Sequence, residues 1–228
     1  MEKLIYLLEK PAEVGIEAYR EQLLTSVTSA CRAEGARQIT LNIADMSEWI
    51  QQEAPGRLIG PWQRVSAVLA FWHECLDARG PIEDSLHTSS PRLSGYLVTE
   101  SVLQSFEPEW EGGERRPGIT QFGANGKPEK VSLEAFYHNW QVLHSAQSFE
   151  LHPRRWSYVR NAVARTLTTG APEYLAIVSE HFRELEDFTV DERYFGSQDA
   201  VNTMIEHLPG FCDLNNMVSV PMSEYYFA

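Results

Sequence analysis

One segment in the second half of the chain combines two aromatic residues with a histidine at helical spacing. Phe136, Trp140 and His144 follow one another at intervals of four residues, so on a helix all three side chains lie on one face. An imidazole buried beside aromatic rings has a lowered pKa and stays neutral near pH 7. His144 can then accept a proton from a phenol, an enol or an activated C–H group, and it is the first candidate catalytic residue. The alternative is a core histidine whose two ring nitrogens are bonded by the surrounding protein.

The predicted strand 155–166 carries the second catalytic candidate. Its side chains alternate between two faces, so Val159, Asn161 and Val163 lie on the same face. The two valines indicate that this face meets the helices, which places Asn161 as a single amide beside His144. There the amide binds a substrate oxygen, or pairs with the histidine as part of the structure.

The opposite face of this strand carries Tyr158 and Arg160, which we expect to point into the interior enclosed by the sheets. Arg160 then pairs with a carboxylate such as Glu180 or Glu224, or binds a substrate anion. Polar side chains on neighbouring strands complete the candidate pocket. The predicted substrate-binding residues are Trp140, Phe136, Tyr158, Arg160, Ser179, His181 and Tyr225.

The elements that position these residues occur twice in the chain. Residues 16–19, Ile-Glu-Ala-Tyr, return as residues 133–136, Leu-Glu-Ala-Phe, and the apolar spacing that follows is retained. In the ungapped alignment, Val27 of the first copy corresponds to His144 of the second. An internal repeat with one altered core position indicates where the chemistry lies.

Each half has the predicted order β-α-β-β-α-β. In the first half the strands are 3–9, 37–44, 64–72 and 93–103, the helices are 16–33 and 75–90, and 46–61 is a loop with a possible helical turn. In the second half the strands are 117–123, 155–166, 174–182 and 217–226, and the helices are 132–147 and 191–208. The charged segment 106–116 contains Gly and is flanked by prolines, which predicts a connector between domains 1–105 and 117–228.

This order predicts an α+β fold of two ferredoxin-like units, each an antiparallel sheet with helices on one face. The uncovered sheet faces must be buried, and pairing the two sheets face to face closes an α/β barrel. A single chain then forms a pseudo-dimer, and further association into a homodimer is possible.

The composition is that of a folded globular protein. Of the 228 residues, 43% are hydrophobic and 11% aromatic, and the formal net charge is −13. An acidic surface repels nucleic acid and anionic membranes, so neither is an expected partner. The apolar run 4–8 is too short for a membrane span and has no cleavage site after it, so we expect a cytoplasmic protein.

The chain has no metal or cofactor motif. Its three cysteines are widely separated, and no histidine spacing typical of a metal site occurs. A GxGxxG that opens a helix, a GxxxxGK[ST] and a GxSxG are all absent. The sequence therefore predicts neither a metal nor a cofactor.

The segment Phe136-x3-Trp140-x3-His144, followed by residues 158–161 (Tyr-Val-Arg-Asn) and a C-terminal Ser-Glu-Tyr strand, resembles the EthD-type family of the dimeric α/β-barrel superfamily. The resemblance covers the second half, and the first half looks like a degenerate copy. It implies the barrel fold and the breakdown or tailoring of hydrophobic, often aromatic or polyketide-like molecules by dehydration, decarboxylation or cofactor-free oxidation. Some related barrels place a histidine against haem, which nothing in this sequence requires. Residues 145–153 replace the short acidic, proline-containing turn that usually follows the helix histidine.

The sequence thus predicts an enzyme of xenobiotic, aromatic or tailoring metabolism that acts without a cofactor on a hydrophobic carbonyl or phenol compound. His144 is its general base and Asn161 orients an oxygen. One alternative is a non-catalytic accessory protein that binds a hydrophobic small molecule in the same pocket. Another is an assembly protein in which Phe136, Trp140 and Trp156 fill the pocket.

Overall fold

Eight antiparallel strands form a closed barrel with helices packed on its outside. The computed structural model describes residues 1–228. Around the barrel the strands follow the order β1-β3-β2-β8-β5-β7-β6-β4, and β4 pairs back with β1. The predicted α+β barrel is confirmed. The strands are β1 Glu2–Glu9, β2 Arg37–Ile43, β3 Ala67–His73, β4 Arg92–Gln104, β5 Ile119–Asn125, β6 Ser157–Thr166, β7 Ala176–Phe182 and β8 Met217–Phe227.

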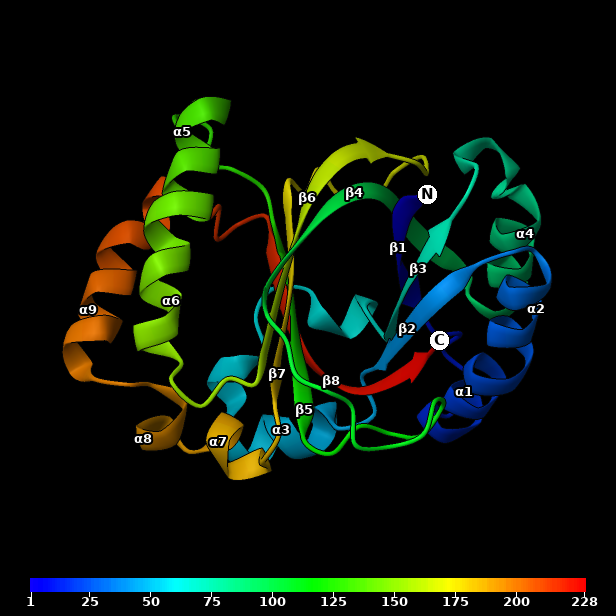
Figure 1. Cartoon of the computed structure of the whole chain (residues 1–228), viewed down its shortest axis with the longest axis horizontal. Coiled ribbons are helices and arrows are strands. Elements are labelled where there is room, and N and C mark those ends of the chain that lie inside the picture. The colour runs from blue at the N-terminus through cyan, green and yellow to red at the C-terminus, as the bar shows by residue number, and fades with distance from the viewer.

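Two groups of helices lie on opposite sides of the barrel, and α3 and α7 lie at its lower end in Figure 1. In Figure 1, α1, α2 and α4 cover the sheet of the first half, and α5, α6 and α9 cover that of the second. None of the helices is long and apolar enough to cross a membrane. The helices are α1 Ile16–Gln22, α2 Thr28–Ala33, α3 Ser47–Glu53, α4 Gly80–Ser89, α5 Leu133–His138, α6 Ser145–Leu151, α7 Leu185–Thr189, α8 Asp191–Tyr194 and α9 Gln198–His207.

Each half of the chain supplies four neighbouring strands in the same relative order, β4-β1-β3-β2 in the first half and β8-β5-β7-β6 in the second. The two sheets join through their edges, because β2 pairs with β8 and β4 pairs with β6. The inner faces thus oppose each other across the barrel, while backbone hydrogen bonds close its circumference. Closure leaves no free sheet edge. The division of the chain at 106–116 remains a prediction.

Helix boundaries differ from the prediction at two glycines. Helix α4 begins at Gly80 and Pro81 rather than at the predicted residue 75, because proline fits the first turn of a helix, where its missing N–H is not needed. The predicted helix 191–208 breaks between α8 and α9. There Gly196 approaches the carbonyl oxygen of Glu150 so closely that an added Cβ would lie 2.0 Å from it, and Ser197 caps α9 through a bond from the backbone N–H of Ala200.

The hydrophobic core is distributed unevenly between the two sides of the barrel. On the first-half side, a cluster of 20 buried residues that includes Tyr19, Leu23 and Val27 joins helices to sheet. On the second-half side, the packing is divided between a cluster around Phe136 and Trp140 and a cluster around Phe182 and Phe188, with 5 buried residues each. The second helix–sheet interface is therefore less completely filled by side chains than the first.

Candidate functional site

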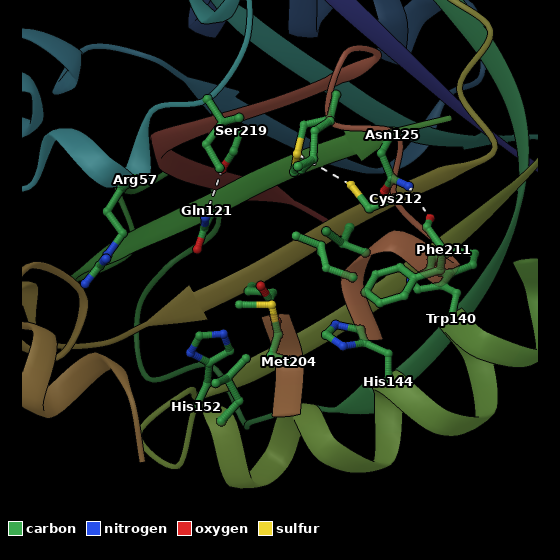
Figure 2. A pocket seen from close by; sticks show the side chains of 18 of the residues that line it. Arg57, Gln121, Asn125, Trp140, His144, His152, Met204, Phe211, Cys212 and Ser219 are labelled. Carbon is green, nitrogen blue, oxygen red and sulfur yellow. Dashed lines mark hydrogen bonds between the residues drawn. The ribbon is translucent and has the colours of Figure 1, made fainter. Parts of the chain in front are cut away.

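A cavity of about 270 Å³ lies between the helices of the second half and the outer face of the sheet. Of its 22 lining residues, 13 are hydrophobic. Trp140, His144 and Met204 approach it from the helices, and Gln121 and Ser219 approach it from the sheet (Figure 2). An apolar cavity with a few convergent polar groups is the usual form of a small-molecule site. We call it the helix-side cavity.

His144 reaches the helix-side cavity from the end of a π-helical turn, Asn139–His144, between α5 and α6. Its ring stacks on Phe211 with ring centroids 4.4 Å apart. Nδ1 is buried without a hydrogen-bond partner, and burial lowers the pKa of His144 to about 4. His144 is therefore neutral near pH 7, and it is not a core histidine with both nitrogens bonded.

Side-chain hydrogen bonds hold this π-helical turn, which leaves backbone carbonyls without their usual helical partners. Ser145 Oγ donates to the carbonyl oxygen of Trp140 at 2.9 Å. Arg160 of β6 donates through Nη1 to the carbonyl oxygen of Gln141 at 2.9 Å and also to Ser145 Oγ. Arg160 thus fixes the helix segment that presents His144.

The first half contains a matching π-helical turn, Leu23–Val27. Thr28 directly follows it, and its hydroxyl donates to the carbonyl oxygen of Leu24 at 2.6 Å. Val27 ends this turn as His144 ends the other, and it is only 2% exposed within the first-half core. The same helix geometry therefore carries a packed valine on one side of the barrel and a cavity-lining imidazole on the other.

A second histidine, His152, lines the helix-side cavity immediately after α6. Its Nδ1 lies 3.0 Å from the carbonyl oxygen of Tyr194. Because a carbonyl can only accept, Nδ1 carries the proton and Nε2 carries the lone pair. Burial lowers the pKa of His152, although the nearby Glu180 carboxylate opposes this effect. His152 is a neutral imidazole with a fixed tautomer.

The carboxylate of Glu180 acts electrostatically on both histidines. Glu180 of β7 lines the cavity and forms an ion pair with Arg155, whose side chain is fully enclosed. Burial by itself raises the pKa of Glu180, but the charge and hydrogen bond of Arg155 outweigh it, and the pKa is lowered. The ionised Glu180 raises the pKa of His144 and of His152, against the larger effect of burial. A proton taken up by either histidine is therefore stabilised by charge.

The first half of the chain contributes the rim of this cavity. Gly56, Arg57 and Ile59, from the predicted loop 46–61, all line it. Ile59 pairs with Ser219 of β8 through two backbone hydrogen bonds of 3.1 Å. Gly60 has a φ of +66°, and an added Cβ would lie 2.0 Å from the carbonyl oxygen of Met217. Only glycine allows this segment to lie against β8.

A chain of contacts from Arg57 to Ser219 fixes the polar rim. Arg57 donates through Nε to the carbonyl oxygen of Phe188 at 2.9 Å, and its guanidinium lies 3.7 Å from the Tyr194 ring centroid. Tyr194 in turn donates its hydroxyl to Gln121 Oε1 at 2.6 Å. Gln121 donates through Nε2 to Ser219 Oγ at 2.9 Å, as Figure 2 shows. Residues from both halves of the chain therefore position the site.

The predicted orientation of β6 is wrong. Val159 and Asn161 line a different cavity, of about 190 Å³, inside the barrel, and Val163 packs in the barrel core. Tyr158 lines the helix-side cavity, and Arg160 binds the helix backbone. Both faces of this sheet are buried, so apolar residues do not indicate which face meets the helices.

The predicted single pocket is therefore two cavities on opposite sides of the sheet. Of the predicted residues, His144, Trp140 and Tyr158 line the helix-side cavity. Asn161, Ser179 and His181 line the barrel cavity, so Asn161 does not lie beside His144. The remaining members of the predicted set line neither cavity.

These members have packing roles. Phe136 is fully buried beside Trp140, in the cluster between helix and sheet. Tyr225 packs in the first-half core. The predicted ion pairs of Arg160 are also wrong, because Glu180 and Glu224 pair with Arg155 and Arg116 instead.

Sequence reasoning missed His152, Arg155 and Arg57. Continuing the four-residue spacing of the apolar helix face beyond His144 leads through Ser148 to His152, and this signal could have identified the second histidine. No comparable signal exists for Arg57, because its contacts lie more than a hundred positions away in the chain. The structure contains no group of three or more His, Cys, Asp or Glu side chains that could hold a metal ion.

No protein-family model matches the chain, and no curated protein matches it. Solved structures resemble it in fold. A provisionally named monooxygenase from Lactobacillus acidophilus has a TM-score of 0.57 and 8% identity, over 100% of this chain and 95% of that one. A similarly named protein from Fusobacterium nucleatum has a TM-score of 0.57 and 5% identity, over 100% and 92%. An anthrone oxidase-like protein has a TM-score of 0.61 and 9% identity, over 99% and 92%. The chain thus has the dimeric α/β-barrel fold, with both halves of the barrel formed by one polypeptide.

Proposed function

We propose that the protein is a small-molecule enzyme of the cofactor-free monooxygenase type, acting on a hydrophobic, aromatic or polyketide-like compound with a phenol, enol or carbonyl group. One observation carries the proposal. Two neutral histidines with ring nitrogens unbonded by the protein line one apolar cavity, next to the ionised Glu180. The names of the similar structures support oxidation over dehydration or decarboxylation.

In this proposal His152 is the general base. The hydrogen bond from Nδ1 to the Tyr194 carbonyl directs the lone pair of Nε2 away from that carbonyl. Nε2 accepts a proton from an acidic O–H or C–H group of the substrate, and Glu180 stabilises the resulting imidazolium. The sequence favoured His144 as base; we place the base at His152 because its tautomer is fixed.

His144 then binds the substrate oxygen. Its buried Nδ1 has no partner, and a proton on Nε2 is the tautomer that provides the cavity with a donor. A neutral imidazole of this kind stabilises a developing enolate or phenolate oxygen by hydrogen bonding.

The overall reaction balances without a cofactor. Loss of the proton leaves an electron-rich carbanion or enolate that reduces dioxygen directly. When an activated methylene becomes a carbonyl, one atom of dioxygen enters the product and the other leaves as water. The substrate supplies all the electrons, so the protein needs to provide only proton transfer, orientation and an apolar enclosure.

The test is oxygen uptake with anthrone and related phenols, with products identified by mass spectrometry. We expect H152Q to lower kcat by about 10²- to 10⁴-fold, and H144Q by about 10²- to 10³-fold. H138Q is the matched control, because His138 is exposed on the same helical segment. Full turnover by H152Q would refute its role as base. Tight binding by the wild-type protein, with the compound recovered unchanged, would favour the non-catalytic accessory function.

We also propose that the second half is related to the EthD-type family and that the first half is a degenerate repeat of it. The matching π-helical turns, each followed by a hydroxyl residue that bonds the turn, support this relationship. A homodimer is not needed to close the barrel, since one chain supplies both sheets. Location in the cytoplasm stays a prediction of the sequence.

A further inference from the structure

The barrel cavity is lined by side chains from all eight strands. Only 6 of its 17 lining residues are hydrophobic, whereas the interior of a small barrel is usually filled by apolar side chains. An eight-stranded barrel is wide enough to hold one small ligand. Apolar packing therefore does not explain why polar side chains line this cavity.

Two asparagines face this cavity from opposite walls. Asn42 lies on β2 and Asn161 on β6, and three strands separate β2 from β6 in either direction around the barrel. Asn42 is 3% exposed and Asn161 is 1% exposed. Both Oδ1 atoms are buried without a hydrogen-bond partner, and neither side-chain amide is hydrogen-bonded by the protein.

Unpartnered amides of this kind are costly. A buried polar group without a partner destabilises the fold by about 1–3 kcal/mol, and native proteins bond nearly all such groups. Two of them on opposing walls of one cavity point to a guest that bonds both. An amide offers one donor group and one acceptor group, so another amide is its natural complement.

The charges in the lining are balanced. Lys3 pairs with Glu100, and Arg116 pairs with Glu224. His181 Nε2 lies 2.8 Å from the Pro117 carbonyl oxygen, which can only accept, so Nε2 carries a proton, and Nδ1 lies 2.7 Å from Thr120 Oγ. An ion in this interior would carry an uncompensated charge, which is expensive to bury. The guest must therefore be uncharged as well as polar.

One end of the cavity is bordered by the segment 105–118, which joins β4 to β5 and which we call the strap. Its Phe106 stacks on Trp156 with ring centroids 3.9 Å apart and an interplanar angle of 7°. Arg116 of the strap lines the cavity and lies 5.3 Å from the Phe106 ring centroid. Apart from an isolated bridge between Arg115 and Tyr225, the strap has no regular secondary structure. Backbone hydrogen bonds from Gly113 to Tyr226 and from Arg116 to Glu224 tie it to β8, and these bonds must open before the strap can move to admit a guest.

We propose that the barrel interior is a second binding site, in which Asn42 and Asn161 hold one small uncharged carboxamide between opposite walls. This site is separate from the helix-side cavity and does not rest on the proposed enzymatic function.

Acetamide is the probe that tests this site. The side-chain NH₂ signals of ¹⁵N-labelled protein are assigned with N42L and N161L and followed during titration. We expect saturable shifts of both signals at one acetamide per chain. In N161L the shift of the Asn42 signal should require at least tenfold more acetamide, and N42L provides the reciprocal measurement if N161L does not fold.

Two controls separate the possible outcomes. N215L makes the same exchange at an exposed position and should leave the titration unchanged. H144Q alters only the helix-side cavity and should also leave it unchanged. Shifts that grow linearly, as those of the exposed Asn215 should, would mean that the interior takes water only and would overturn the proposal. Loss of the response in H144Q would place acetamide in the helix-side cavity and would overturn it equally.

Discussion

Acidification should destabilise the folded protein through His144. In the unfolded chain its pKa is near 6.5, while in the folded protein burial lowers the pKa to about 4. Between these values the unfolded state binds the proton and the folded state does not. Stability therefore falls as the pH drops below about 6.5, and the loss levels off below about 4.

The magnitude follows from the two pKa values. Each tenfold difference in proton affinity corresponds to about 1.4 kcal/mol. Relative to pH 7.5, the contribution of His144 to the free energy of unfolding should fall by about 2 kcal/mol at pH 5 and by about 3 kcal/mol at pH 4. The H144Q variant lacks this proton-binding group and should lose correspondingly less stability over the same range.

The assay is urea unfolding of wild type, H144Q and H138Q at intervals from pH 7.5 to 4. The other buried histidines are present in all three proteins, so their contributions cancel in the differences. We expect the H144Q curve to approach or cross the wild-type curve on acidification, while H138Q, altered at an exposed position, runs parallel to wild type. If H144Q also ran parallel to wild type, the native imidazole would titrate normally and the assignment of His144 as a dry, neutral group would be wrong.

Other variants test the packing around the site. Arg155→Met leaves the largely enclosed Glu180 carboxylate without its partner and should cost about 3–5 kcal/mol in urea unfolding. The double variant with Glu180→Gln should recover most of the loss, and equal stability of the single and double variants would contradict the ion pair. In Gly60→Ala the added Cβ would clash with the Met217 carbonyl oxygen, and alanine would be strained at a φ of +66°. The variant should lose more than about 2 kcal/mol of stability. Gly15→Ala, with nothing within 4 Å, is its control and should change the unfolding midpoint little; equal effects of the two alanines would argue against the close approach to β8.

Most of the fold could be predicted because it depends on local pattern. Alternation and four-residue spacing reflect the geometry of strands and helices, so the order of elements in each half follows from the sequence. Boundaries were less predictable where a glycine makes a non-local contact, as Gly196 does with Glu150. The same limit applies to Gly60, which is glycine because it lies against Met217 of β8.

The candidate site was predicted only in part. The spacing that places Trp140 and His144 on one helix face led correctly to the helix-side cavity. The alternation along β6 separated Tyr158 from Asn161 correctly, but it could not say which of them faces the helices. Both faces of this strand are buried, so hydrophobicity distinguishes them poorly.

The sequence by itself determined the order of strands and helices, the apolar helix face and the presence of a histidine where the first half has Val27. The tertiary structure alone decided that Asn161 faces the barrel interior, that the Tyr194 carbonyl fixes the tautomer of His152, and that Arg57 crosses from the first half to the rim of the site. The reason is physical. Periodicity records how a residue is placed on its own element, whereas hydrogen-bond partners, tautomers and cavity walls depend on which distant elements pack against it.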